Sequence, residues 1–493
     1  MTDAKKSKDL KPSNIKGEVD VNEKNPWGDD ALERQKFAQP LIDLVNSVED
    51  APFCIDVDGE WGSGKTFFLK RWCAEFSKEG KAIYFNAWRD DFYTDPLTAI
   101  IGQLWNELEK GKMKDIGNLL KEDWWNTVKK ATLNLSYSGV KLGDFQSPAR
   151  KTLKEYLEER GSIDILQKQL QELAGATHKK TERPLVFVVD ELDRCRPTFA
   201  IELLERVKHI VGVPGIVFVF GINQKQLEES IRSVYGDIGA ADYLRKFFDV
   251  GMTLPQAEAS KYCTYLIKKH KIDQAITKSP VHNTQYGEMR WKSDWPVVVN
   301  VIPTMLDYMG LSLRQTEQAI RMWLIILHSK EVAEKPGMCM YEGSLAFLIL
   351  LRIKNRDMYK RFLNEECEPK EIMNYMLGFL PWEESRVDEC RKRKDCMHGI
   401  AWACYFFYKE EECLEIINEF EQAREAKSAD ELSQEYRYVP QKIIEIQNDN
   451  TRHDSIIRLL NLIKHAKDTK WFQSPPSRQI VARFLEWGDN WRI

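Results

Sequence analysis

The sequence predicts an α/β protein with a parallel sheet, followed by a largely α-helical region. Runs of apolar, β-branched residues such as 185–189 and 216–220 alternate with helical periods up to about residue 255. Uninterrupted apolar runs are typical of parallel strands that are buried on both faces, and their alternation with helices favours an α/β sheet. From residue 258 onward almost only helical periods recur, which predicts a second, α-helical part of the chain.

Five segments are expected to form the sheet, with helices between them. The strands are predicted at 53–58, 82–85, 185–189, 216–220 and 250–255. The helices are predicted at 32–45, 67–73, 97–108, 199–211 and 226–235, where apolar residues recur at helical spacing. Residues 110–182 are less regular, and we expect a long charged helix through Tyr156 and a further helix over 164–173. We interpret this block as an insertion into the sheet domain.

Composition and charge narrow the class of protein. The chain has 493 residues, 43% of them hydrophobic, so about two to four domains with sizeable cores can form. A net charge of −4 provides no global electrostatic case for nucleic acid. The longest apolar runs are well below the ~18 residues of a membrane span. Ten cysteines without framework spacing, behind a polar N-terminus, predict reduced thiols and a cytoplasmic location.

The first predicted strand runs into a glycine-rich loop with the pattern G-x-x-x-x-G-K-[ST]. The loop comprises Gly59, Glu60, Trp61, Gly62, Ser63, Gly64, Lys65 and Thr66, and Phe67 continues into a helix. Its glycines let successive backbone N–H groups point at a phosphate, and the helix N-terminus faces the same group. Lys65 supplies a positive charge to the terminal phosphates, and Thr66 offers a hydroxyl to Mg²⁺. Strand, loop and helix in this order predict a P-loop that binds a nucleoside triphosphate.

Two acidic residues follow the buried run at 185–189. Asp190 is expected to face the magnesium held by Thr66, and Glu191 to orient and deprotonate the attacking water. The alternative is a strand end capped by solvated acids. The long separation from Lys65 leaves room for a strand between the two motifs, which is typical of the additional-strand class of P-loop NTPases and predicts the strand order 5-1-4-3-2. Within the first strand, Asp56 and Asp58 need partners, because an unpaired buried carboxylate is costly.

Further polar residues are candidates for the same site. Asn223 ends the next buried strand and is expected to reach the γ-phosphate or the water; a plain turn residue is the alternative. The stretch 223–226 lacks the aspartate of a guanine reader, which favours ATP. The basic candidates for stabilising the transferring phosphoryl group are Arg194, Arg245, Lys246, Arg314 and Arg321. The alternative for each is a solvated surface residue.

Two other clusters point to no specific chemistry. Cys390, Cys396, His398 and Cys404 lie close together in sequence, but their spacings do not match zinc modules. We therefore interpret them as ordinary cysteines and histidine of a helical region. The basic run 391–394 follows acidic residues, so a mixed solvated surface is expected there rather than a nucleic-acid patch.

The motifs in this order resemble those of the KAP family of P-loop NTPases, which is named after a kinase D-interacting neuronal membrane protein and a plasmid-encoded phage-exclusion protein. The resemblance rests on 61–66, 85–88, 190–195 and 243–246, and it covers residues 28 to about 325. It implies an ATP-binding domain of the additional-strand class with a helical lid. It also implies that Lys65, Thr66, Asp190 and Glu191 hold ATP and magnesium. Arg314 takes the place of the lid arginine, although the neighbouring Asn-Pro of the family is missing.

Sequence and resemblance together predict the domain organisation. We expect a disordered tail at 1–27, a P-loop NTPase core at 28–255 with its helical insertion at about 110–182, a helical lid at 256–330 and an α-helical domain at 331–493. Many family members carry transmembrane helices between the two nucleotide motifs, whereas residues 110–182 are too polar for that. The family often has two aspartates where this chain has Asp190 and Glu191, and a glutamate should serve at least as well as a base.

These observations predict a cytoplasmic ATPase that works as a switch. The C-terminal helices are expected to bind an unidentified protein partner or a phage-derived trigger, and a role in phage defence follows by analogy with the family. A homo-oligomer is expected, since arginines often act between copies of a protein. Binding of nucleic acid and a membrane-spanning segment are not expected. One alternative is a non-hydrolysing scaffold that ATP stabilises. Another is a DNA-stimulated motor, which the acidic balance disfavours.

Overall fold

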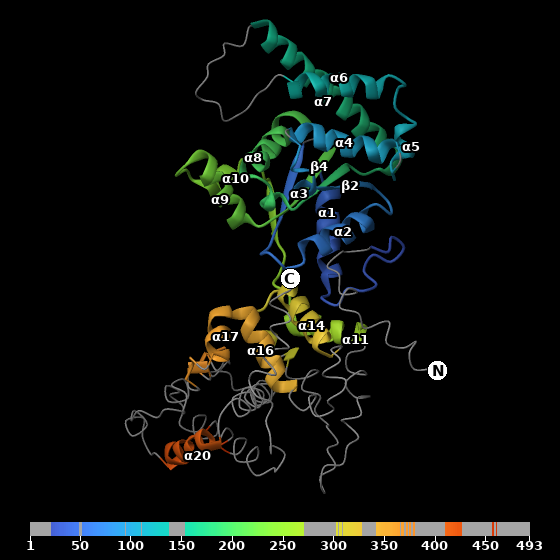
Figure 1. Cartoon of the computed structure of the whole chain (residues 1–493). Coiled ribbons are helices and arrows are strands. Elements are labelled where there is room, and N and C mark those ends of the chain that lie inside the picture. The colour runs from blue at the N-terminus through green and yellow to red at the C-terminus, as the bar shows by residue number, and fades with distance from the viewer. Residues whose placement is uncertain are drawn as a thin grey trace, which may run out of the picture. The chain divides into compact units, whose positions relative to one another are not determined.

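The computed structural model describes most of the first half of the chain and parts of the second. The described residues are 21–48, 52–93, 95–109, 111–137, 153–270, parts of 302–327 and of 342–379, 410–425, 456–457 and 460. The chain divides into two compact units, Glu18–Ala257 and a second that includes Glu258–Ile493 (Figure 1). The first twenty residues of the predicted tail, the cluster of Cys390, Cys396, His398 and Cys404, and the basic run 391–394 lie outside the described residues.

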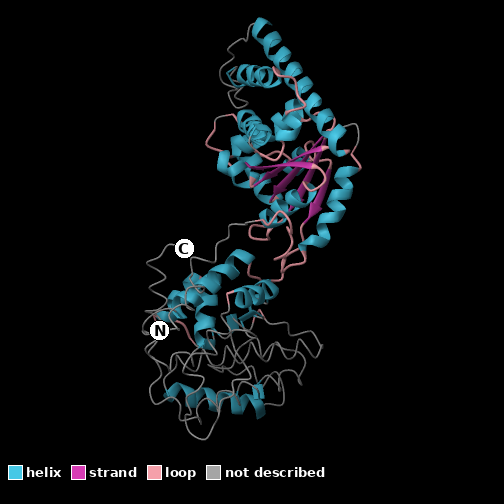
Figure 2. Ribbon diagram, turned by 90° about the vertical axis from the view of Figure 1, so that its right-hand side faces the viewer, coloured by secondary structure: helices cyan, strands magenta, loops and turns pink. Residues whose placement is uncertain are grey.

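The first unit contains a five-stranded parallel sheet. Its strands are β1 (Phe53–Asp58), β2 (Lys81–Asn86), β3 (Leu185–Asp190), β4 (Ile216–Ile222) and β5 (Val250–Thr253). They lie in the order β2-β3-β4-β1-β5, and every neighbouring pair is parallel (Figure 2). This order confirms the predicted 5-1-4-3-2 topology and the additional-strand class. In the register, Asn86 pairs with Asp190 and Asp190 with Gly221, so polar groups collect at the carboxyl ends of the strands.

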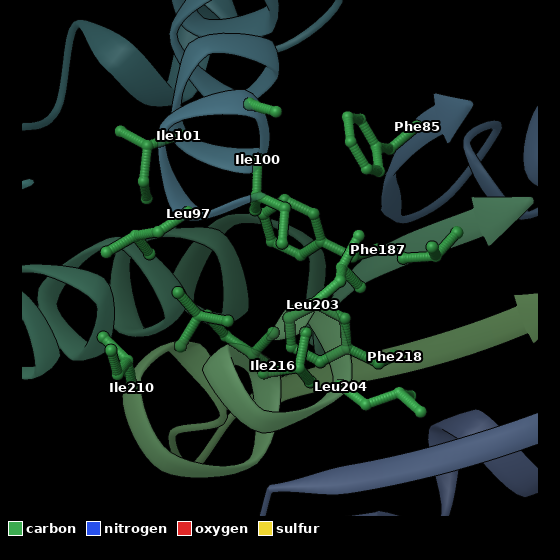
Figure 3. Close-up of a cluster of buried hydrophobic side chains, with 14 of the residues drawn as sticks. Phe85, Leu97, Ile100, Ile101, Phe187, Leu203, Leu204, Ile210, Ile216 and Phe218 are labelled. Carbon is green, nitrogen blue, oxygen red and sulfur yellow. The ribbon is translucent and has the colours of Figure 1, made fainter. Parts of the chain in front are cut away.

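Helices cover both faces of the sheet, as the uninterrupted apolar strands predict. One face packs against α1 (Ala38–Asn46) and α2 (Lys65–Phe76) through side chains such as Ile55, Val57 and Val188. The other face packs against α4 (Pro96–Glu109) and α8 (Pro197–Arg206). Figure 3 shows this second core, in which Phe85, Phe187 and Phe218 from three neighbouring strands meet Leu97 and Ile100 of α4 and Leu203 and Leu204 of α8.

The insertion after α4 is more regular than its sequence indicates. It contains α5 (Lys114–Gly117), α6 (Trp124–Tyr137) and α7 (Leu153–Thr181), and α6 lies alongside α7 (Figure 1). The two helices expected through Tyr156 and over 164–173 are one continuous helix, so that prediction was wrong. Gly161 lies in the first third of this helix without ending it, and the hydroxyl of Ser162 donates to the carbonyl of Glu158 one turn earlier, a contact that a helix accommodates.

Smaller differences concern the ends of the helices. A 3₁₀ turn at Arg34–Phe37 precedes α1, so the regular helix begins later than residue 32. After α8, Val207–Val211 form a π-helical turn instead of continuing the predicted α-helix to residue 211. The remaining helical segments of this unit are α3 (Ala87–Asp90), a 3₁₀ turn at Leu192–Arg194, α9 (Gln224–Tyr235) and α10 (Ala240–Leu244).

The second unit is helical in its described residues. Its longer helices are α11 (Ala259–Lys269), α14 (Leu313–Leu327), α16 (Glu342–Lys354), α17 (Arg356–Leu363) and α20 (Glu410–Glu425). The Tyr262 hydroxyl of α11 donates to Glu317 of α14 at 2.5 Å, and Phe347 of α16 meets the ring of Phe362 in α17 edge-on. None of the described helices is both long enough and apolar enough to cross a membrane.

Candidate functional site

The glycine-rich loop connects the carboxyl end of β1 to the first turn of α2. β1 ends at Asp58 and α2 begins at Lys65, so the strand, loop and helix follow one another as the motif predicts. Gly62 and Gly64 have φ angles of 81° and 92°, a region that other residues rarely adopt. The loop therefore depends on glycine at these two positions to bring its backbone round to the N-terminus of α2.

The side chain of Lys65 lies inside the loop. Its ammonium group donates to the carbonyl of Gly59 and, at 3.2 Å, to that of Glu60. Burial lowers the pKa of Lys65, and the negative charges of Asp193, Asp190 and, to a smaller extent, Asp58 act against this effect. The positive charge predicted for the terminal phosphates thus lies among the loop carbonyls and within reach of several carboxylates.

Asp190 is the most deeply buried carboxylate of the site, with 1% of its surface exposed. The Tyr84 hydroxyl donates to its Oδ2 at 2.7 Å, and the backbone N–H of Glu191 donates to its Oδ1 at 2.9 Å. Burial raises the pKa of Asp190, and hydrogen bonds from Tyr84 and Thr66 oppose that rise. The two residues predicted to hold magnesium are therefore in hydrogen-bond contact, and both offer the hard oxygen ligands that Mg²⁺ prefers.

No other metal site is visible in the part of the chain that the structure describes. Within those residues no three His, Cys, Asp or Glu side chains gather in a way that could hold a metal ion. A magnesium ion at Thr66 and Asp190 would accordingly take its remaining ligands from phosphate oxygens and water, as this ion commonly does.

Both carboxylate oxygens of Glu191 are held by neighbouring side chains. The amide of Asn86 donates to Oε2 at 2.8 Å, and the guanidinium of Arg194 donates to Oε1 at 2.6 Å. Glu191 itself has a φ of 62°, which is uncommon for a residue with a side chain and directs the chain sharply into the 3₁₀ turn. The candidate base is thus fixed by its backbone and by two partners.

The turn after Glu191 also contacts the P-loop. The indole Nε1 of Trp61 donates to Oδ2 of Asp193 at 2.5 Å. Asp193 is 7% exposed, whereas Trp61, in the loop itself, has half of its surface exposed. The sequence analysis assigned no role to Asp193. Its signals in the sequence are its place in the motif 190–195 and its being the third acidic residue there, after Asp190 and Glu191.

Segments before β1 support the loop from its other side. Arg34 is 2% exposed and donates to the carbonyl of Ser63 at 3.0 Å. Farther along α2, the guanidinium of Arg71 lies 3.5 Å from the ring centroid of Phe67 and pairs with Asp29 at 2.6 Å. Arg34 was missed as a site residue, because its surroundings in the sequence are those of an ordinary charged helix start.

Asn223 and Asp58 meet at the start of α9, on the same edge of the sheet. The Oδ1 atom of Asn223 accepts from the backbone N–H of Gln226 at 3.3 Å, and Asp58 accepts from that of Gln224 at 2.8 Å. Both side chains therefore cap the helix, as expected for a turn residue. Since its oxygen is used in the cap, the Asn223 amide can serve a ligand through its NH₂ group, and that role stays a prediction.

The two acidic residues of β1, Asp56 and Asp58, have different surroundings. The strand continues to Asp58, which has its partner at the start of α9. Asp56 is largely buried, and burial together with the charge of Asp58 raises its pKa to about 6. A Cβ added to Gly251 in β5 would lie 2.8 Å from a carboxylate oxygen of Asp56, so the neighbouring strand needs a glycine here.

The structure does not bring Arg245 to the P-loop of its own chain. Four residues later, Asp249 donates its N–H to the carbonyl of Cys54 at the start of β1, whereas the P-loop follows the end of this strand. At ~3.3 Å per residue, the two ends of β1 are about 16 Å apart. Arg245 is 80% exposed and pairs with Asp242 at 2.7 Å. Arg314 is exposed at the start of α14 in the second unit, and its lid role stays a prediction.

Three comparisons with known proteins were made, and the match to a family model is the one that agrees with these motifs. A search of curated protein sequences gives no match. Among solved structures, the ORC2 protein of Aeropyrum pernix in its ADPNP–ADP complexes is similar with a TM-score of 0.29 at 13% identity, over 93% of this chain and 86% of that one. Its ADP form gives the same TM-score and identity, over 98% and 88% of the two chains. The model of the KAP family P-loop domain matches residues 34–329, more than half of the chain. This chain therefore belongs to the KAP family of P-loop NTPases and is a nucleotide-binding protein.

Proposed function

We propose that this protein binds ATP with magnesium and hydrolyses it to ADP and phosphate. The observation that supports this best is the position of Glu191. It directly follows the buried Asp190, which is hydrogen-bonded to Thr66 of the P-loop. A carboxylate next to a metal-binding carboxylate and a phosphate loop is placed where a base for water is needed.

Lys65 binds the phosphates in this proposal, and Thr66 and Asp190 bind the metal ion. Lys65 exchanges its contacts with the Gly59 and Glu60 carbonyls for the terminal phosphate oxygens, which are stronger acceptors because they are charged. Thr66 and Asp190 hold the magnesium ion. The buried Asp190 carboxylate suits a cation, because a positive charge offsets the cost of ionising it in an apolar environment. When bound, magnesium would neutralise part of the phosphate charge.

Glu191 acts as the general base in this proposal. It accepts a proton from the attacking water while the new bond forms to the γ-phosphorus and the bond to the ADP oxygen breaks. Each of its oxygens has a second lone pair, so Glu191 can accept the proton while Asn86 and Arg194 keep the side chain in place. The arginine then remains near the reacting phosphate, where its charge stabilises the transition state.

The choice of ATP over GTP follows from the stretch after β4. Asn223 and Asp58 cap α9 there, and the stretch 223–226 has no aspartate that could pair with the edge of a guanine. We further infer that ATP turnover switches the state of a cytoplasmic homo-oligomer, and that the helices of residues 331–493 bind a protein partner or a phage-derived trigger. A role in phage defence extends the proposal by family resemblance.

The test is a phosphate-release assay on the full chain with three proteins. We expect turnover in the wild type, neither turnover nor tight ATP binding in Lys65→Ala, and ATP binding without turnover in Glu191→Gln. The loss in Glu191→Gln should be at least about 100-fold, since a general base contributes that much. Turnover of Glu191→Gln at the wild-type rate would remove Glu191 from the mechanism.

One observation favours a second function, a non-hydrolysing scaffold that ATP stabilises. Both oxygens of Glu191 accept hydrogen bonds from side chains, so part of its capacity to accept from water is already used in this conformation. The scaffold predicts that ATP raises the melting temperature of the wild type while phosphate release stays at the Lys65→Ala level. The defence role is tested separately, by comparing phage plaque formation on bacteria that express the wild type or Lys65→Ala.

A further inference from the structure

Trp61 is an unusual residue at the centre of a phosphate loop. Half of its surface is exposed, and it belongs to neither of the two hydrophobic cores of the first unit. The indole therefore contributes little to the stability of the fold by burial. Its polar end is the part with a defined partner, since Nε1 donates to Oδ2 of Asp193.

Asp193, the acceptor in this contact, needs the hydrogen bond more than Trp61 does. The residue is buried and belongs to the 3₁₀ turn that directly follows Glu191, whereas Trp61 stands 132 positions earlier in the sequence. A buried carboxylate is costly unless it is hydrogen-bonded, so Asp193 requires a donor at this place. The hydrogen bond consequently joins the middle of the P-loop to the turn that positions the candidate base.

We propose that Asp193 is a positioning residue, which holds the P-loop through the indole N–H of Trp61 in the shape that receives the nucleotide phosphates. This inference rests on the proposed binding of ATP to the loop. It adds a requirement that the P-loop pattern itself does not contain, because the pattern leaves the position of Trp61 open.

The need for such a contact follows from the composition of the loop. Three of its residues between Asp58 and Lys65 are glycines, which gain the most conformational freedom when a segment is released. A loop that is already fixed loses less entropy when it binds phosphate, and this pre-organisation raises affinity. Arg34 fixes the backbone at Ser63, and Asp193 fixes the side chain of Trp61 two residues earlier.

The same carboxylate also acts on the lysine of the loop. Among the charges that offset the burial of Lys65, that of Asp193 has the largest effect. Asp193 therefore acts on the indole N–H through a hydrogen bond and on the ammonium through its charge. A change at Asp193 should disturb the loop at two places, and a change at Trp61 only at one.

The decisive comparison is Trp61→Phe against Trp88→Phe, with the dissociation constant of a non-hydrolysable ATP analogue and magnesium as the readout. Phenylalanine keeps an aromatic ring but lacks the N–H donor and is smaller than the indole, and the control has to account for this loss of size. Trp88 is a matched control, because it is about equally exposed and does not belong to the loop, while the guanidinium of Arg194 lies 5.6 Å from its ring centroid. We expect Trp61→Phe to bind about tenfold more weakly, since hydrogen bonds to charged groups have effects of this size, and Trp88→Phe to bind like the wild type.

Variants of Asp193 test the partner. An asparagine retains an oxygen that accepts from the indole but lacks the charge that acts on Lys65, so Asp193→Asn should recover part of the affinity that Asp193→Ala loses. The double variant Trp61→Phe/Asp193→Ala should bind no more weakly than Asp193→Ala alone, because both changes remove the same contact. Where turnover is measurable, Trp61→Phe should raise KM and leave kcat unchanged, a split that a general loss of structure does not produce.

The outcomes separate the inference from the proposed function. A wild type that binds no ATP analogue overturns the proposed function. A wild type that binds while Trp61→Phe binds equally well overturns the role of the Trp61–Asp193 contact alone, as do additive effects in the double variant. If Asp193→Ala does not fold, as judged by circular dichroism, the comparison of Trp61→Phe with Trp88→Phe still decides.

Discussion

The side-chain amide of Asn86 lies 2.8 Å from Oε2 of Glu191 and donates a hydrogen bond to it. Asn86 is the last residue of β2, and the register pairs it with Asp190, directly before Glu191. Arg194 holds the other oxygen at 2.6 Å. The side chain that we propose as the base is thus restrained by the neighbouring strand and by its own turn, and each of these hydrogen bonds occupies a lone pair that could otherwise accept from water.

Replacing Asn86 by serine should raise the basal rate of phosphate release. Asn86 also accepts from the backbone N–H of Arg89 at 2.8 Å and caps α3. Serine caps helices about as well as asparagine but is too short to reach Glu191. Oε2 is then free to face water, and we expect an increase of about tenfold, which corresponds to the loss of one hydrogen bond to a charged group. Steady-state phosphate release at saturating ATP measures it.

Two results would change this interpretation of Asn86. A fall of turnover in Asn86→Ser to the level of Glu191→Gln would mean that Asn86 aligns the base instead of restraining it. An increase that persists in Asn86→Ser/Glu191→Gln would assign the extra activity to another group. Equal affinity of Asn86→Ser and wild type for an ATP analogue is the control that the P-loop itself is intact.

Arg34 should affect nucleotide binding although it lies before the first strand. It is buried and donates to the carbonyl of Ser63, so Arg34→Met leaves that carbonyl without its donor and loosens the P-loop. We expect about tenfold weaker binding of ATP by calorimetry, and partial recovery in Arg34→Lys, which keeps one donor. Arg183→Met is the control, because Arg183 packs over Phe76 at the far end of α2 and pairs with Glu79. Similar losses in both methionine variants would contradict a specific role of Arg34.

Asp56 makes the first unit less stable as the pH rises. Its folded-state pKa of about 6 exceeds the ordinary value of 3.8, so the folded chain keeps this proton at pH values where the unfolded chain has lost it. Stability is therefore highest below pH 4 with respect to this group and falls as the pH rises through 6. Asp56→Asn removes the penalty and should stabilise the protein by about 2 kcal/mol at pH 7.5 once screening by solvent is included.

Urea unfolding of Asp56→Asn and wild type at two pH values measures this effect. At pH 4.5 the gain should be less than half of that at pH 7.5, because the folded carboxyl is then still largely protonated and most of the pH interval between the two pKa values, over which the penalty builds up, lies above pH 4.5. A gain of the same size at both pH values would show that the substitution acts by packing against Gly251 rather than by charge.

The strand order could be predicted from the sequence because it depends on local signals. Val186 to Val189 and Val217 to Phe220 are apolar at every position, as in strands buried on both faces, and the spacing of the two nucleotide motifs leaves room for the additional strand. The P-loop residues are likewise adjacent in sequence, so a single pattern identifies them. The long helix α7 was not predicted as one element, since Gly161 and Ser162 separate its charged first turns from the apolar stretch that begins at Ile163.

The supporting residues of the site could not be predicted, because their contacts join distant segments. Tyr84 and Asp190 are 106 positions apart, Trp61 and Asp193 are 132 apart, and Arg34 precedes Ser63 by 29. Hydrophobic periodicity indicates which face of an element is buried, but not which polar group of another element meets it. These contacts follow only once the parallel register has brought the ends of β1, β2 and β3 together.

Arg245 should act on the nucleotide of a second copy of this chain, if it takes part in hydrolysis. Within one chain, the segment that contains it adjoins the start of β1, and the P-loop follows the other end. The side chain is 80% exposed, so Arg245→Ala should leave the fold intact. We expect Arg245→Ala to bind ATP normally and to lose turnover by roughly 10³-fold, the effect of an arginine that stabilises phosphoryl transfer.

Mixing two inactive variants tests the action between copies. Glu191→Gln lacks the base and Arg245→Ala lacks the arginine, so in a mixed oligomer some sites combine an intact Glu191 with an intact Arg245 from the neighbour. Phosphate release should therefore reappear in the mixture, in proportion to the mixed oligomers that size-exclusion chromatography detects with an ATP analogue. Arg232→Ala, another surface arginine paired only locally in α9, should retain full turnover alone. A mixture that stays inactive although mixed oligomers form would exclude the action of Arg245 between copies, because only a residue supplied by the neighbour can be restored by mixing.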